Sequence, residues 1–211
     1  MSRLILVRHG ETIWHRENRY AGRTDIALTS EGVAQATRLA HWAQYANLNA
    51  VWSSPLSRAR FTAQGAAEAA GLPLQIDDRL IEIDFGRGEG MTGAEMSMVF
   101  PGEREAFLRD PVAHSLPGGE DPLQAAQRGV QALRSIAAAG GGEARSLVVA
   151  HSTLLRLVLC SLLEIPLARY RTALPSLANG ALTEIDMTDT TVALMYLNVP
   201  LADKETKVDR I

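Results

Sequence analysis

The chain has 211 residues, of which 46% are hydrophobic and 21% are charged, close to the average for a globular domain. A formal net charge of −3 gives no support for nucleic acid or an anionic membrane as a partner. We expect residues 1–211 to form one domain, because no repeat or linker divides the chain.

The first residues and the single cysteine bear on the protein's location. Arg3 and Arg8 interrupt the first apolar run too early for a secretory signal peptide, and no run approaches the roughly 20 apolar residues of a membrane span. Cys160 is alone, so no internal disulfide can form, and its apolar surroundings favour a core residue over a reactive thiol. We therefore expect a cytoplasmic protein.

Short apolar runs alternate with amphipathic segments along the chain. In chain order the predicted elements are a strand at 4–7, a helix at 30–45, a strand at 50–53, a helix at 55–70, a strand at 74–76, a helical insertion near 91–116, a helix at 122–139, a strand at 146–150, a helix at 152–163, and two strands near 181–185 and 191–198. This alternation predicts a mostly parallel sheet with helices on both faces.

Helix ends and loops carry further signals. Thr29 or Ser30 is expected to cap the first helix, and Pro55 to open the second. The spacing of Thr92 and Glu95 is typical of a capping box, and Asp121 is the expected N-cap of the long helix that follows. The charged tail near 203–211 is expected to be loose.

Polar residues follow four of the predicted strands at the points where those strands end. Arg8 and His9 follow the first strand, Arg58 lies just beyond the second, Glu82 follows the third, and His151 directly follows the strand at 146–150. The carboxyl ends of parallel strands share one edge of a sheet, where ligands bind in such folds. These side chains are therefore predicted to converge.

Two histidines, two arginines and a carboxylate suit phosphoryl transfer. Guanidinium groups match phosphate oxygens, a neutral imidazole such as His9 can attack phosphorus, and a second histidine can donate to a phosphoryl oxygen. Glu82 can protonate the leaving oxygen. Taken alone, each of these residues is more often structural than catalytic, and we interpret His41 and His114 as structural. The joint pattern of the other residues favours a catalytic role. We expect no metal or other cofactor, because arginines supply the positive charge and the histidines lack zinc-site spacing.

Several motifs resemble those of the histidine phosphatase superfamily, the phosphoglycerate mutase-like proteins. They occur in the family's order over roughly residues 3–185: Leu6 to Thr12, Gly22 with Asp25 and Leu28, Ser53 to Ala59, Glu82 with Phe85-Gly86 and Glu89-Gly90, Pro117 to Glu120, and Ala150-His151 with Arg156. The resemblance implies a three-layer α/β/α sandwich. It also implies that His9 is the nucleophile, that Glu82 is the proton donor, and that Arg8, Arg58 and His151 hold the phosphate.

Two positions depart from the family pattern. His15 stands where the family often has an asparagine that holds phosphate; an imidazole can still donate one hydrogen bond, or His15 points away and the loop is rebuilt. Ser152 and Thr153 replace a glycine-rich pair, and Ser152 is predicted to cap its helix in preference to binding phosphate. Ala21 and Gly22 complete the candidate substrate-binding residues.

The resemblance favours a phosphatase, similar to alpha-ribazole phosphatase and broad-specificity phosphatases, over a phosphomutase. The chain is short, its acid loop over 85–90 is similar to the phosphatase version, and Ala21 stands where mutases tend to carry a hydroxyl. A non-catalytic relative that binds a phosphorylated ligand or a protein is the remaining alternative. A homodimer is also left open, with no surface indicated.

The expected substrate is a small phosphomonoester whose identity the sequence does not reveal. The cavity walls are expected from the loop at 13–23 and the insertion near 91–115. Within the loop, Arg19 and Arg23 either meet a second anion, such as a carboxylate, or are solvated charges. Ile13, Trp14 and Tyr20 either face a bulky organic group or pack within the loop, so sugar phosphates, phosphoglycerate-like acids and nucleotide-type phosphates all stay open.

Overall fold

A computed structural model describes residues 1–201, and the predicted loose tail near 203–211 lies outside the described residues. Its centre is a sheet with the strand order β3-β2-β4-β1-β5-β6. The strands are β1 Ser2–Arg8, β2 Ala50–Ser53, β3 Leu74–Ile76, β4 Arg145–Ala150, β5 Leu182–Met187 and β6 Val192–Val199. Pairings among β3, β2, β4 and β1 are parallel, whereas β5 is antiparallel to both β1 and β6. The prediction of a mostly parallel sheet is confirmed.

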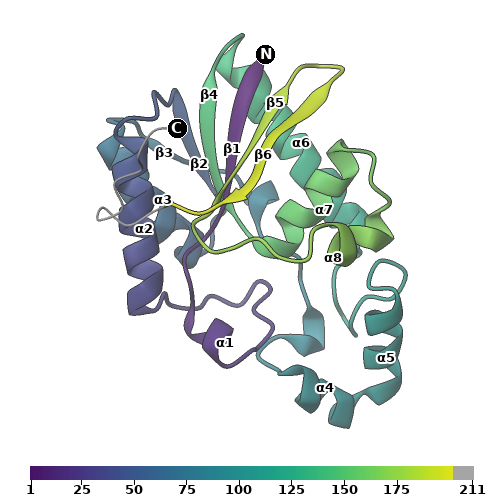
Figure 1. The fold of residues 1–211 in the computed structure, drawn as a ribbon. Coiled ribbons are helices and arrows are strands. Elements are labelled where there is room, and N and C mark those ends of the chain that lie inside the picture. The colour runs from purple at the N-terminus through teal and green to yellow at the C-terminus, as the bar shows by residue number, and fades with distance from the viewer. Residues whose placement is uncertain (202–211) are drawn as a thin grey trace, which may run out of the picture.

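Helices cover both faces of this sheet and complete the predicted three-layer α/β/α sandwich (Figure 1). On one face lie α2 Ser30–Ala43 and α3 Ser57–Ala69, and on the other lie α6 Pro122–Gly140 and α7 Ser152–Leu162. Their amphipathic stripes explain the arrangement, because each helix buries its apolar residues against the sheet and its neighbouring helix.

The middle residues of the central strands β1 and β4 are apolar because both faces of these strands are buried. Along β1, Leu4 and Leu6 pack in the core beneath α6 and α7, whereas Ile5 and Val7 pack in the core beneath α2 and α3. This alternation follows from the two-residue repeat of a strand, and β4 repeats it. Cys160 on α7 is fully buried in the first of these cores, as predicted.

The observed caps explain where the helices begin. The Thr29 hydroxyl accepts the N–H of Gly32 at 3.0 Å, and the Asp121 carboxylate accepts the N–H of Leu123 at 2.8 Å. The expected helix start at Pro55 is wrong by two residues: α3 begins at Ser57, because the N–H of the preceding Ser54 still bonds to β4.

The insertion contains α4 Gly93–Val99 and α5 Pro101–Arg109, with the predicted capping box at the start of α4. The insertion lies beyond the edge of the sheet, near α1 Ile13–Arg16 (Figure 1). The helices α1 and α8 Tyr170–Ala173 were not predicted, since four residues are too few for a helical repeat to show. The same holds for the 3₁₀ turns η1 Asp78–Leu80, η2 Gly86–Gly88 and η3 Leu167–Arg169.

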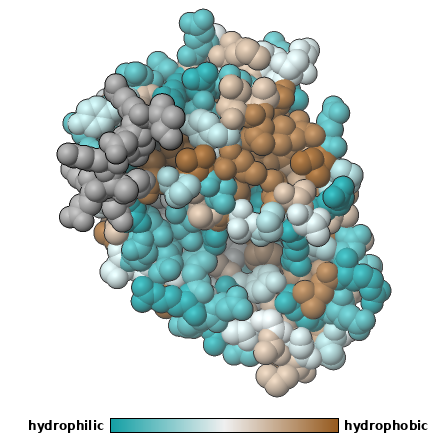
Figure 2. Space-filling model, viewed as in Figure 1, coloured by the Kyte–Doolittle hydropathy of each residue, from teal (hydrophilic) through white to brown (hydrophobic). Residues whose placement is uncertain are grey.

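The edge strand β6 carries a group of exposed apolar side chains, visible as a brown patch in Figure 2. Its members are Leu194, Met195, Leu197 and Val199.

Among residues 1–201, no helix combines the length and the apolar character that a membrane span requires.

Candidate active site

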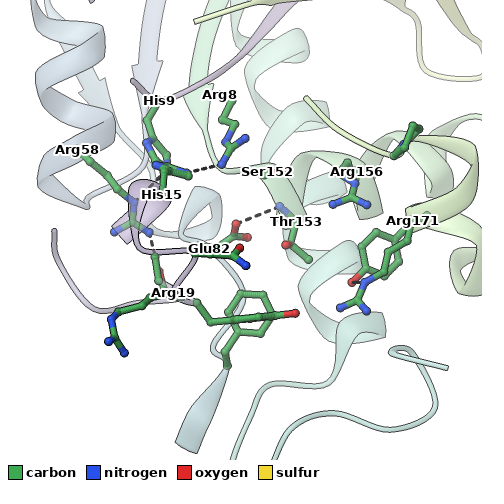
Figure 3. A pocket seen from close by; sticks show the side chains of 17 residues that line it. Arg8, His9, His15, Arg19, Arg58, Glu82, Ser152, Thr153, Arg156 and Arg171 are labelled. Carbon is green, nitrogen blue, oxygen red and sulfur yellow. Dashed lines mark hydrogen bonds between the residues drawn. The ribbon is translucent and has the colours of Figure 1, made fainter. Parts of the chain in front are cut away.

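A cavity of about 480 Å³ opens at the edge of the sheet where the parallel strands end. Seventeen residues line it, most of them polar (Figure 3). Eight of the nine predicted site residues are among them: Arg8, His9, His15, Ala21, Gly22, Arg58, Glu82 and Ser152. The ninth, His151, lies beside the His9 ring and does not itself line the cavity.

His9 follows β1, and its two ring nitrogens have different environments. Nδ1 donates to the carbonyl of Gly10 at 2.7 Å, so the proton of the neutral ring resides on Nδ1. Nε2 accepts the Nε–H of Arg58 at 3.2 Å, so this nitrogen carries the lone pair of a ring that lines the cavity. Burial first, and then the positive fields of His151, Arg58 and Arg8, hold the pKa of His9 well below its usual value. The ring is therefore neutral at neutral pH.

Arg58 in the first turn of α3 is fully buried and fixed by three bonds. Beside its bond to His9, Nη1 donates to the carbonyl of Thr24 at 2.8 Å and Nη2 to the carbonyl of Gly22 at 2.6 Å. Burial lowers the pKa of Arg58, while the carboxylates of Glu82 and Asp25 raise it. The guanidinium thus joins β1, the loop over 21–24 and the cavity.

Arg8 and His15 lie together on the cavity wall. Arg8 Nη1 donates to the carbonyl of Leu177 at 2.8 Å, and its Nη2 contacts His15 Nε2. His15 Nδ1 accepts the N–H of Thr12 at 2.8 Å, which turns Nε2 toward the cavity, so His15 does not point away. Burial lowers the pKa of Arg8 to about 10 and, together with the charge of Arg8, lowers the pKa of His15 to about 4.

His151 directly follows β4 and is completely buried. Its ring centre lies 5.1 Å from that of His9, and its Nε2 lies 2.7 Å from the hydroxyl of Ser54. Within residues 1–201, its Nδ1 is buried without a hydrogen-bond partner. Burial and the charge of Arg58 hold its pKa well below the usual value.

Glu82 joins the loop after β3 to the start of α7. Its carboxylate accepts the N–H groups of Thr153 at 3.0 Å and Leu154 at 2.8 Å, and so it caps this helix from another part of the chain. The predicted cap by Ser152 is therefore wrong. The helix begins at Ser152, so its N-cap position is His151. The backbone N–H groups that an N-cap side chain would bind already donate to Glu82. The Ser152 side chain lines the cavity instead.

A second carboxylate, Glu89, holds the loop that contains Gly22. It accepts the N–H groups of Arg23 and Thr24, both at 2.8 Å, and the Thr24 hydroxyl at 2.5 Å. Gly22 has a φ of +48°, and a Cβ at this position would lie 1.8 Å from Oε1 of Glu89. The sequence singled out Glu89 only as part of a motif, because nothing in its local spacing shows which loop it binds.

The cavity walls differ in part from the expectation. Arg19 and Tyr20 line the cavity, but Ile13, Trp14 and Arg23 do not, and no lining residue comes from the insertion near 91–115. Arg19 is paired with Glu17 and Glu95, and Arg23 with Glu120, so neither is a free cation for a second anion. The far wall comes instead from α7 and α8, which supply Arg156, Tyr170 and Arg171.

Among residues 1–201, no group of three or more His, Cys, Asp or Glu side chains is placed to hold a metal ion.

Comparison with known proteins finds two phosphatases and a protein named as a mutase among the similar chains. Phosphoserine phosphatase 1 of Hydrogenobacter thermophilus is 33% identical over 81% of this chain and 80% of its own. A Salmonella choleraesuis protein named "Probable phosphoglycerate mutase GpmB" is 32% identical over 79% of this chain and 77% of its own. The structure of a mycobacterial glucosyl-3-phosphoglycerate phosphatase in complex with VO3 aligns with a TM-score of 0.84 and 29% identity, over 93% of this chain and 99% of that one.

The family model of the histidine phosphatase superfamily (branch 1) matches residues 4–200, nearly the whole described chain. The match includes every strand of the sheet from β1 to β6 except the first two residues of β1. On this match and on the identity to its relatives, the chain belongs to the histidine phosphatase superfamily and is an enzyme of the phosphatase type.

Proposed function

We propose that the protein hydrolyses small phosphomonoesters through a phosphohistidine formed on Nε2 of His9. The observation that carries this proposal is the state of the His9 ring. Its Nδ1–H is committed to the carbonyl of Gly10, burial and positive neighbours keep it neutral, and its Nε2 lone pair lies beside Arg58 at the cavity. A neutral, oriented imidazole is the form that can attack phosphorus.

In the first step, the Nε2 lone pair forms a bond to phosphorus while the bond from phosphorus to the leaving oxygen breaks. Glu82 donates a proton to that oxygen. Its Oε2 accepts one backbone N–H, from Thr153, which leaves a lone pair free to carry the proton. In the second step, water attacks phosphorus, Glu82 takes a proton from the water, and the bond between nitrogen and phosphorus breaks to release phosphate.

Positive charge for the phosphoryl oxygens comes from Arg8 and Arg58, so the proposed reaction needs no metal ion. His151 adds a neutral donor. We take the Ser54 hydroxyl to donate to Nε2 of His151, so that the ring proton resides on Nδ1, which is buried beside His9 without a partner in the described chain. His15, whose Nε2 contacts Arg8, lies on the wall of the same region.

The relatives support hydrolysis as the outcome, since two of the three named above are phosphatases. The third is named as a mutase, and a mutase would return the phosphoryl group to an organic hydroxyl instead of water. Release of inorganic phosphate in a stoichiometry of one per ester cleaved therefore distinguishes the two reactions.

The test is steady-state hydrolysis of p-nitrophenyl phosphate and a panel of phosphomonoesters in excess EDTA. The wild type is expected to remain active with the chelator, and His9→Ala to lose activity by a factor of roughly 10³ or more. His41→Ala is the matched control, because His41 is an exposed histidine on α2 that does not line the cavity. Undiminished activity in His9→Ala would contradict the proposal.

A further inference from the structure

Five arginines line the cavity, whereas Glu82 is the one carboxylate among the lining residues of the described chain. Three of the five arginines are already engaged. Arg58 binds two carbonyls and His9, Arg8 binds a carbonyl and contacts His15, and Arg19 is paired with two carboxylates. The other two arginines, Arg156 and Arg171, therefore supply the positive charge of the cavity that residues 1–201 leave without a carboxylate partner.

Neither of these two arginines has a salt bridge to a carboxylate within residues 1–201. Arg156 on α7 uses its Nε to donate to the carbonyl of Leu174 at 2.6 Å, and Arg171 on α8 uses its Nε to donate to the hydroxyl of Tyr170 at 2.9 Å. The terminal Nη groups of both side chains donate to no group in the described part of the chain. Each guanidinium therefore offers its outer N–H groups to the cavity.

Aromatic rings fix the orientation of both guanidinium groups. Arg156 lies over the ring of Tyr170 at 4.8 Å, and Arg171 lies over Phe107 at 4.4 Å and over Tyr170 at 5.4 Å. The shared Tyr170 ring brings the two like charges together. Burial is the main cause that lowers the pKa of Arg156, and the positive charge of Arg171 lowers it further. The two cations therefore repel one another across this wall. An anion between them would relieve that repulsion.

The pair lies on the side of the cavity away from His9, His15 and Arg58, with Glu82 between the two groups (Figure 3). In the proposed reaction Glu82 protonates the leaving oxygen, so the leaving alcohol extends past Glu82 toward the far wall. The group that arrives there belongs to the alcohol and not to the transferred phosphate.

We infer that Arg156 and Arg171 form a second anion subsite, and that the substrate is a phosphomonoester whose leaving alcohol carries its own anionic group, a carboxylate or a second phosphate. This inference rests on the proposed function for the direction in which the ester lies. Planar guanidinium groups suit either anion, because each can donate two parallel N–H bonds to neighbouring oxygens.

The experiment uses three esters that share a three-carbon chain: propyl phosphate, the phosphate ester of 3-hydroxypropanoate, and propane-1,3-diol bisphosphate. Values of kcat/KM are measured for each with the wild-type protein. At least one of the two anionic esters is expected to exceed propyl phosphate by roughly 10- to 100-fold, the range of a charge-assisted contact. The carboxylate and bisphosphate arms identify which anion the subsite takes.

The same ratios are then measured in Arg156→Gln, Arg171→Gln and the double variant. Each single variant is expected to reduce the preference for the anionic ester by about 10-fold, and Arg156→Lys, which keeps the charge without the planar fork, by less. Arg169→Gln is the control for net charge, because Arg169 is an exposed arginine two residues before Arg171 and does not line the cavity. Its preference is expected to match that of the wild type. Thermal unfolding of each variant identifies a loss of fold.

Binding separates this inference from the proposed reaction. Calorimetric titration of His9→Ala with the three esters measures the preference without turnover. If the wild type cleaves none of the esters but His9→Ala prefers an anionic one and loses that preference in the double arginine variant, the subsite stands and the reaction fails. Equal affinity and equal kcat/KM for all three esters, or a preference that survives the double variant, would overturn the subsite.

Discussion

Replacing Gly22 by alanine tests whether the loop that holds Arg58 is fixed by Glu89. An alanine Cβ at this position would lie 1.8 Å from Glu89 Oε1 and 2.4 Å from its Cδ, so the carboxylate must move. The φ of +48° adds the strain of a left-handed conformation. Gly71 provides a matched control, since its φ is +68° and no atom outside its chain neighbours lies within 4 Å of an added Cβ.

The two variants share the conformational cost, which is about 1 kcal/mol for a non-glycine residue at positive φ. In Gly22→Ala, the displaced Glu89 also gives up its bonds to the N–H groups of Arg23 and Thr24 and to the Thr24 hydroxyl. These bonds are solvent-accessible, so we assign roughly 1 kcal/mol to each, below the roughly 1.5–3 kcal/mol of hydrogen bonds to charged groups. Gly22→Ala is therefore expected to reduce the free energy of unfolding by about 3–4 kcal/mol and Gly71→Ala by about 1 kcal/mol.

The assay is urea denaturation of both variants, followed by kcat/KM for a phosphomonoester. Because the carbonyl of Gly22 binds Arg58 Nη2 at 2.6 Å, the shift should displace that guanidinium and reduce kcat/KM by roughly 10-fold or more. Gly71→Ala should retain wild-type kcat/KM. Equal stabilities and equal activities in the two variants would refute the reasoning. If Gly22→Ala does not fold, Glu89→Gln, which removes the charge with little change of size, provides the same comparison.

Three further predictions follow from the site and the core. The pKa of His15 is about 4 in the folded protein and 6.5 in the unfolded chain, so as pH falls through this window only the unfolded chain gains the proton. The free energy of unfolding is therefore expected to fall by about 2 kcal/mol at pH 5. Urea titrations at several pH values should show that His15→Asn abolishes this part of the pH dependence. Glu82→Gln should reduce kcat for propyl phosphate by roughly 10²–10⁴-fold but much less for p-nitrophenyl phosphate, whose leaving group needs no proton; equal losses would argue against Glu82 as the acid. Cys160 is fully buried and burial raises its pKa, so a thiol reagent should modify it only in denaturant, and rapid labelling of the native protein would contradict this packing.

The position of the site could be predicted from the sequence because it depends on short-range rules. Apolar runs mark β1 and β4, parallel strands align their carboxyl ends, and His9 and His151 directly follow those two strands. Arg58 comes within reach because α3 begins soon after β2, the neighbour of β4 on its other side. Each step needs only the local pattern and the rule that neighbouring parallel strands end at one edge.

The parts that could not be predicted depend on contacts between distant segments. Ser152 has the residue type of an N-cap, yet Glu82, far from it in sequence, binds the free amides of α7. Arg171 lies on a four-residue helix with no periodicity of its own, and the rings of Phe107 and Tyr170 place it on the cavity wall. Local spacing contains neither relationship, so the caps and the far wall emerge only with the tertiary structure.

The most direct test of the account is to trap the covalent intermediate. The wild-type protein is mixed with a phosphomonoester labelled in its phosphoryl group, quenched in alkali, which preserves phosphohistidine, and digested for mass spectrometry. The account predicts an acid-labile phosphate on the peptide that contains His9, absent from His9→Ala and present in His41→Ala. A phosphoryl group on another residue, or turnover by His9→Ala at the wild-type rate, would contradict it.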